Sequence, residues 1–136
     1  MLELNDFRIT ISGIEGRACF CVGNIAFPSE NWLELVSSDL EAWATSIVSF
    51  GLRHTDRCDF CFCDGPYAFR LEWKKDTVWA SGFHNGKEVL PSREVDIQSL
   101  LRSFVKAVRR YNRFRHEGGL EPVFIKELSI LHDILT

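Results

Sequence analysis

Three of the five cysteines in this chain stand close together in the segment CDFCFCDGPYAFRLEW, residues 58–73. Thiolates are among the ligands that zinc prefers, and His54 lies nearby in the sequence. In an extended strand, however, Cys61 and Cys63 point to one face and Cys58 points to the other. No glycine between them allows the chain to bend around a metal. The spacing therefore favours a strand in which cysteine serves as a small, readily buried apolar residue.

Cys19 and Cys21 also share one face of a strand, so a metal site between two adjacent strands stays geometrically open there. A redox-active thiol needs a low pKa and solvent access, commonly at a helix N-terminus, which a cysteine inside a strand lacks. Five thiols cannot all pair within one chain, and a domain of this size does not need disulfides. We therefore expect reduced thiols, no metal and no cofactor.

Other catalytic patterns are missing from the sequence. It contains no G-x-S-x-G, no H-E-x-x-H and no phosphate-cradling glycine loop. Asp56, Asp59 and Asp64 are spread over a predicted strand and turn, whereas a divalent-cation loop needs closely spaced oxygen ligands. We expect a protein that is not an enzyme and has no small-molecule substrate.

Length and charge set the broad class. The 136 residues fit a single domain, residues 1–136, with 46% apolar residues and a net charge of −3. Residues 1–100 hold nine Lys and Arg against fifteen Asp and Glu, and residues 101–136 hold seven against four. The body is therefore mildly acidic and the C-terminal segment is basic. With no apolar run of about 18 residues and no signal-like start, we expect a cytoplasmic protein without a membrane segment.

The first half of the chain reads as a hairpin followed by a helix. Alternation of Phe7, Ile9 and Ile11 with polar residues predicts a half-buried strand, and the apolar run over residues 17–27 predicts its partner. Apolar residues from 32 to 48 then approximate helical spacing until a glycine at 51. A serine or aspartate at 38–39 is a second capping point, so this segment is one bent helix or two short ones.

The second half reads as a meander, a long helix and a short last helix. The pairs Asp64-Gly65, Lys75-Asp76 and Asn85-Gly86 suit tight turns and separate four antiparallel strands. Asp96 is a suitable N-cap for a helix over about 97–115. The expected fold class is α+β: an antiparallel sheet of about six strands (hairpin, helix, four-stranded meander, helix) with the helices packed on one face.

The register of the central hairpin decides which aromatic residues face solvent. A two-residue turn at Lys75-Asp76 directs Trp79 and Phe83 outward, whereas a three-residue turn swings Trp79 into the core beside Leu71. The sequence leaves both registers open. In the outward case, aromatic and charged side chains form a surface typical of protein binding. Its candidate partner-binding residues are Asp59, Asp64, Arg70, Glu72, Trp79, Phe83 and Glu88.

A basic stripe lies on the long helix opposite its apolar face. It consists of Arg102, Lys106, Arg109, Arg110 and Arg113. Such a stripe is typical of a solvated helix face, and it is also compatible with a phosphate-binding face. The alternative function is therefore a nucleic-acid-associated or regulatory binding module that uses this stripe.

Two stretches, NWLELVSSDLEAWATSI and GPYAFRLEWKKDTVWASG, give the chain a layout that resembles small bacterial immunity proteins. The resemblance is strongest to those of contact-dependent growth inhibition. It implies a protein that binds a cognate toxin domain, often a nuclease, and blocks its active site or substrate-binding surface. Because such immunity proteins have no catalytic residues, the resemblance assigns none to this chain. The acidic first hundred residues suit a cationic partner, whereas the basic helix departs from that picture.

Overall fold

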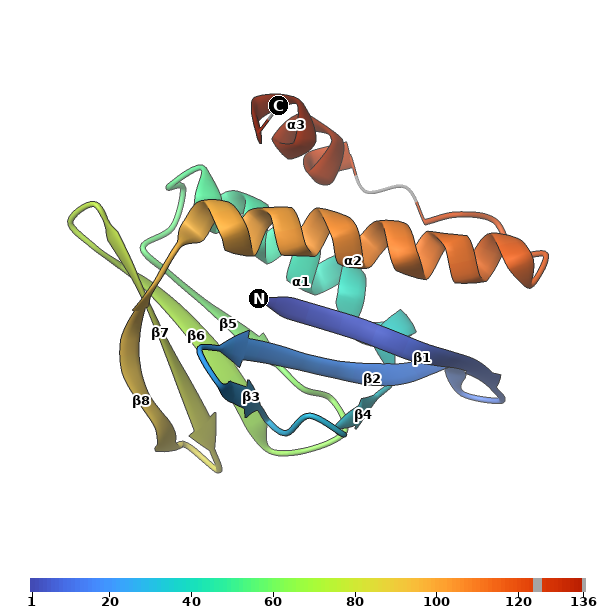
Figure 1. Ribbon diagram of the computed structural model, residues 1–136, viewed down its shortest axis with the longest axis horizontal. Helices are drawn as coiled ribbons and strands as arrows, with labels where there is room; N and C mark the ends of the chain where they lie inside the picture. The colour runs from blue at the N-terminus through green and yellow to red at the C-terminus, as the bar shows by residue number, and fades with distance from the viewer. Residues whose placement is uncertain (124–125, 136) are drawn as a thin grey trace.

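The chain folds into two antiparallel sheets and three helices (Figure 1). A computed structural model describes residues 1–123 and 126–135. The first sheet contains β1 (Leu2–Thr10), β2 (Gly13–Val22), β3 (Ile25–Phe27) and β4 (Leu33–Glu34). The second contains β5 (Arg57–Cys61), β6 (Tyr67–Lys74), β7 (Thr77–His84) and β8 (Lys87–Val95). The helices are α1 (Val36–Gly51), α2 (Ile97–Glu117) and α3 (Lys126–Leu135).

The α+β class and the antiparallel pairing are confirmed, but the expected single sheet of about six strands is wrong. The hairpin and the meander form two separate four-stranded sheets, ordered β1-β2-β3 with β4 also on β2, and β5-β6-β7-β8. The reason is that β3 and β4 pair with β2 and occupy the edge that the meander would need. On the other side, α2 covers β1, where Ser103 Oγ accepts a hydrogen bond from the Leu2 amide at 2.9 Å.

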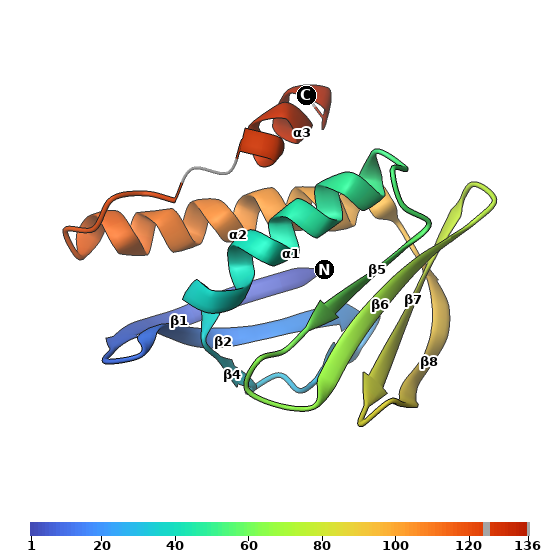
Figure 2. The same ribbon diagram turned by 180° about the vertical axis from the view of Figure 1, so that it is seen from behind.

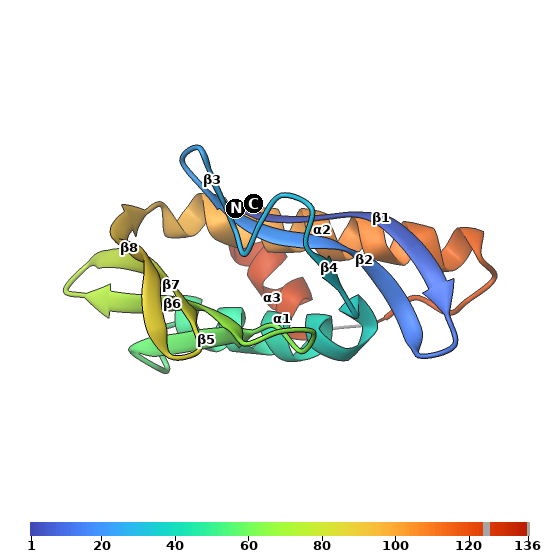
Figure 3. The same cartoon turned by 90° about the horizontal axis from the view of Figure 1, so that it is seen from below.

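The helices gather on one side of the two sheets. In Figures 1 and 2, α2 runs along β1, whereas α1 packs against both β2 and β5. Helix α3 contacts both of these helices on the side away from the sheets. Seen from below, the two sheets lie next to each other beneath the helices (Figure 3). The interior between the sheets and helices is filled by aromatic rings. Phe20 on β2 stacks on Phe69 of β6 with ring centroids 4.2 Å apart, and Trp43 of α1 is 5.6 Å from Phe20.

The first strand does not follow the expected alternation. The pairing of β1 with β2 shifts register around Asp6, whose φ of +53° marks a bulge. Leu4 ahead of the bulge is buried, whereas Ile9 is 59% exposed and Ile11, in the turn, is fully exposed. The prediction that Ile9 and Ile11 join Phe7 in the core is therefore wrong. Ile9 stands opposite the buried Ile14 but lies next to the β1–β2 turn, at the end of the hairpin, and Ile11 is in the turn itself.

The first helix is shorter at its start than its apolar spacing suggested. It begins at Val36, and Leu33–Glu34 instead form β4 on the edge of β2. The Trp32 carbonyl accepts a hydrogen bond from the Ala18 amide at 3.0 Å, which holds this segment extended. From Val36 the helix continues unbroken to Gly51, so the alternative of two short helices is also excluded.

The second helix matches its prediction in position and phase. The Asp96 carboxylate accepts hydrogen bonds from the Gln98 amide at 3.3 Å and from the Ser99 hydroxyl at 2.6 Å. The hydrogen bond from Ser99 is the main reason that the pKa of Asp96 is lowered. Phe104 is fully buried, and its ring centroid lies 5.4 Å from that of Phe60.

We predict that Phe104→Ala lowers the free energy of unfolding by about 3–5 kcal/mol, because it removes a buried ring and leaves a cavity. Chemical denaturation followed by circular dichroism measures this change. Arg109→Ala, at an exposed position of the same helix, is the control and should change the free energy by less than about 0.5 kcal/mol. A loss below about 1 kcal/mol for Phe104→Ala would contradict its central place in the core.

Candidate partner-binding face

The central hairpin has the register that a two-residue turn requires. Lys74 pairs with Thr77, so only Lys75 and Asp76 form the turn, and Lys75 adopts a φ of +59°. This confirms the register that directs Trp79 and Phe83 away from the core. The pairs that follow are Trp73 with Val78, Leu71 with Ala80, and Phe69 with Gly82.

The meander thus has two chemically different faces. Phe69, Leu71 and Ala80 are fully buried on the inner face. Gly82 is also needed there, because a Cβ atom at this position would stand 2.6 Å from the ring of Phe27. We call the opposite, outward side of β5–β8 the meander face. It carries Trp79 and Phe83, both half-buried, together with charged residues on the neighbouring strands.

Each aromatic ring of the meander face has a cation over it. The guanidinium carbon of Arg70 lies 4.3 Å from the centroid of the Phe83 ring, and Lys74 Nζ lies 5.4 Å from that of Trp79. Arg70 Nε also donates a hydrogen bond to Asp59 Oδ1 at 2.8 Å, and this bond is the main reason that the pKa of Arg70 is raised. These contacts hold the rings and their neighbours in defined positions.

Three glutamates flank the two rings. Glu72 on β6 and Glu94 on β8 stand directly opposite Trp79, and Glu88 on β8 stands opposite Phe83. Glu94 was missed by the sequence reasoning. Counting residues from the Asn85-Gly86 turn would place a serine opposite Trp79, but β7 and β8 shift register around Gly82 and bring Glu94 there instead.

Of the seven predicted partner-binding residues, Asp64 does not join the others. Asp64 lies in the turn between β5 and β6, and its Oδ2 accepts a hydrogen bond from the Leu35 amide at 2.8 Å. Next to it, the fully buried Glu34 carboxylate accepts hydrogen bonds from Trp32 Nε1 at 2.9 Å and from the Cys63 amide at 2.7 Å. Asp64 therefore helps to tie this turn to the start of α1. The other six predicted residues lie on the meander face.

Cys58 and Cys61 point to opposite faces of β5 as predicted, but Cys63 lies beyond the strand, and the predicted burial is not found for Cys61 and Cys63. Cys58 points inward and packs against the core. Cys61 lies at the end of β5 and Cys63 just beyond it, and both are exposed. The expectation that they serve as buried apolar residues is wrong for these two, because Cys61 is on the solvent side of β5 and Cys63 is in the turn that follows, while Phe60 and Phe62 fill the interior.

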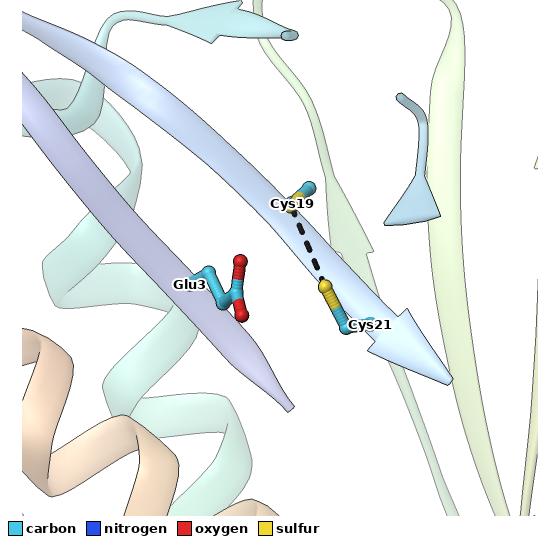
Figure 4. Close-up of side chains that lie close together, drawn as sticks. All are labelled: Glu3, Cys19 and Cys21. Carbon is cyan, nitrogen blue, oxygen red and sulfur yellow. Dashed lines mark hydrogen bonds between the residues drawn. The ribbon is translucent and has the colours of Figure 1, made fainter. Parts of the chain in front are cut away.

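Two groups among the described residues bring metal-ligand atoms within 4.8 Å of one another: Glu3 with Cys19 and Cys21, and Glu34 with Cys63 and Asp64. In the second group both carboxylates already accept the N–H bonds given above. In the first group, shown in Figure 4, the two sulfur atoms are 3.8 Å apart. Burial, followed by the neighbouring Cys21, raises the pKa of Cys19 to about 12, and burial also raises that of Cys21.

The basic stripe of α2 is present as expected. All five cations are exposed, and none forms an ion pair with a carboxylate among residues 1–123. One of them, Arg110, also reaches the Leu4 carbonyl at 3.4 Å. The stripe lies on a helix, whereas the meander face lies on the second sheet, so the two candidate surfaces belong to different elements.

A comparison with protein families, curated proteins and solved structures finds no match to this chain. Within the described part of the chain, no helix has both the length and the apolar character needed to cross a bilayer.

We predict that an alkylating reagent at pH 8 modifies Cys61 well before Cys58. Burial, followed by the charge of Asp59, raises the pKa of Cys58 to about 12, so very little of the reactive thiolate forms at this pH. Cys58 also faces the core, whereas Cys61 is exposed. Peptide mass mapping after timed labelling measures the order, and early modification of Cys58 would contradict the inward direction of its side chain.

Proposed function

We propose that this protein is an immunity protein that binds a cognate bacterial toxin domain, a nuclease, and blocks its active site or substrate-binding surface with the meander face. The observation that carries the proposal is the pair of half-buried aromatic rings, Trp79 and Phe83, on one outward strand face between charged neighbours. Large aromatic residues surrounded by polar groups are the usual sites of concentrated binding energy in protein interfaces.

The rigidity of this face supports the proposal. Trp79 and Phe83 stand on a strand that is paired on both sides, and Lys74 and Arg70 lie over their rings. Ordering a flexible side chain on binding costs about 0.5–1.5 kcal/mol, so rings that are already held lose less entropy when a partner docks. A pre-ordered sheet surface of this kind suits tight binding to a folded protein domain.

The charges of the meander face favour a cationic partner. Its cations are Arg57, Arg70 and Lys74, and its carboxylates are Asp59, Glu72, Glu88 and Glu94. Asp59 is engaged by both arginines, at 2.8 Å from Arg70 and 3.6 Å from Arg57. This leaves three glutamates and Lys74 around the rings, and we propose that the glutamate carboxylates take the place that phosphate groups occupy in a nuclease cleft. Complementary charge of this kind raises the rate of association and fixes orientation.

The second candidate function is binding of nucleic acid by the basic stripe of α2. It is favoured by the five exposed cations on one helix, none of them in an ion pair with a carboxylate among residues 1–123. This function requires affinity for generic RNA or DNA that falls steeply as salt rises. An immunity protein acting through the meander face requires no such affinity, so a salt titration with an unrelated oligonucleotide separates the two.

We predict that Trp79→Ala weakens toxin binding by about 2 kcal/mol or more, because an anchor ring is lost from the centre of the interface. Co-expression with a candidate nuclease domain encoded beside this protein's gene scores growth, and calorimetry on the purified pair measures affinity. Ile9→Ala is the matched control, since Ile9 is an exposed apolar residue on the other sheet.

The outcomes of that experiment are distinct. Cell death without a complex would show that the immunity function is wrong. If Trp79→Ala and Phe83→Ala both bind the toxin with normal affinity and still protect the cells, the immunity function stands. The binding interface then lies elsewhere than on the meander face.

We predict that charge reversal at Glu72 or Glu88 mainly slows association with the toxin. Solvent-accessible charges beside an interface act over distance, so the reversal of the exposed Glu88 or of the half-buried Glu72 should lower the association rate constant and weaken its dependence on salt. Stopped-flow mixing at several ionic strengths measures both quantities. Asp76→Lys, an exposed charge in the β6–β7 turn, is the control. An equal effect from the control would mean that only the overall charge matters.

A further inference from the structure

The outward face of the first sheet carries a second cluster of reactive side chains, unrelated to the meander face. Cys19 and Cys21 project from the same side of β2, and Glu3 stands directly opposite Cys19 on β1 (Figure 4). Leu2, Leu4, Ala18 and Phe20 alternate with them and fill the core on the other side. Strand pairing therefore fixes the backbone positions of all three side chains before any ligand binds.

We propose that Glu3, Cys19 and Cys21 form a binding site for a thiophilic divalent cation, Zn²⁺, with two sulfur ligands, one carboxylate ligand and an open fourth position. Two sulfurs bound at about 2.3 Å to one tetrahedral zinc ion stand about 3.8 Å apart. The sulfur atoms of Cys19 and Cys21 are 3.8 Å apart in the structure, and the carboxylate of Glu3 lies within 4.8 Å of them. The donor set therefore needs only a small movement of the exposed Glu3 side chain to close on the ion.

Electrostatics around the cluster support a cation there. In their ligand forms, Glu3, Cys19 and Cys21 each carry one negative charge, and their ligand atoms lie within 4.8 Å of one another. The ammonium group of Met1, which donates a hydrogen bond to the Cys21 carbonyl, is the positive charge beside them, and it only partly offsets the repulsion among the three anionic groups. A divalent cation removes this repulsion and binds the thiolate form directly.

Solvent can reach this cluster through a surface pocket of ≈ 300 Å³. Besides Glu3 and Cys19, the pocket is lined by Asn5, Arg17, Glu30 and Asn31. Arg17 does not neutralise the site, because its Nε pairs with Asp6 at 2.6 Å and with the Asn5 side chain at 3.0 Å. The pocket gives an entry path for the ion, and the Glu30 carboxylate belongs to its lining.

The second cluster of possible ligands shows by contrast what makes the first one suitable. At Glu34, Cys63 and Asp64 the carboxylates are committed to backbone and indole N–H groups that hold a turn in place. Binding a metal there would break those bonds. No structural N–H bond of this kind to Glu3 is found among the described residues, so its carboxylate is able to turn toward an ion. This inference differs from the expectation of no metal. The sequence pointed to Cys19 and Cys21 as possible ligands but not to Glu3.

The test is a titration of the full chain, kept reduced with a phosphine, with Zn²⁺ and with Co²⁺ as a coloured substitute. We expect one ion per chain and a sulfur-to-cobalt charge-transfer band that Zn²⁺ displaces. Cys21→Ser should weaken binding at least about 100-fold, since loss of even an outer-shell partner costs roughly 10–100-fold. Glu3→Gln, an exposed change that leaves the core intact, should weaken it about 10-fold or more.

Cys61→Ser and Glu41→Gln are the matched controls, because each removes the same chemical group from an exposed position outside the cluster. Both should keep full affinity and the charge-transfer band, and circular dichroism checks that every variant is folded. Absence of a band in the folded, reduced protein would overturn the proposal. So would equal weakening by Cys61→Ser, or a folded Glu3→Gln variant with unchanged affinity. None of these outcomes bears on toxin binding by the meander face.

Discussion

The stack of Phe20 on Phe69 is the contact on which the arrangement of this molecule depends. The two sheets share no strand pairing among the described residues, so side-chain packing has to join them. The two rings are nearly parallel, with centroids 4.2 Å apart, and Phe20 also lies 5.1 Å from Phe60. Such aromatic pairs add about 0.5–1.5 kcal/mol beyond the burial of their surface. Because helices α1 and α2 place Trp43 and Phe104 around the same ring, this one contact also positions both helices.

A buried carboxylate provides the second connection between the sheets. Glu34, on β4 of the first sheet, accepts hydrogen bonds from the amides of Cys63 and Asp64 at the β5–β6 turn. A polar group inside a protein is costly unless its oxygen atoms accept hydrogen bonds, and here backbone and indole N–H groups donate to them. The Asp64 carboxylate in turn accepts a hydrogen bond from the Leu35 amide at the start of α1. The end of the meander is thereby attached to the first helix at a fixed point.

Turn residues and a helix cap act over a few neighbouring residues, so the sequence predicted the features of the fold that they determine. Turn residues predicted the four antiparallel strands of the meander, and Asp96 predicted the start of α2. The sequence left two registers open for the β6–β7 hairpin, and the strand pairing decides that Trp79 and Phe83 face outward. The division into two sheets did not, because β3 and β4 have only three and two residues and exist through their pairing with β2. Glu94 and the Glu3–Cys19–Cys21 cluster depend on strand pairing between distant segments, which turn residues do not report.

The alternation of side chains along each strand explains how one small domain holds two separate candidate sites. On β2, Phe20 belongs to the core while Cys19 and Cys21 face the opposite side, and on β7 Ala80 is buried while Trp79 faces outward. The residues that build each site therefore lie beside core residues in sequence but contribute little to the shared interior. Since the two sites lie on different sheets and share no hydrogen bond or ion pair among the described residues, changes in one should add to changes in the other without coupling. The two sheets are joined by the aromatic core, by the hydrogen bonds of Glu34 and by the bond from Arg93 to the Val22 carbonyl, so changes in these shared contacts would affect both sites together.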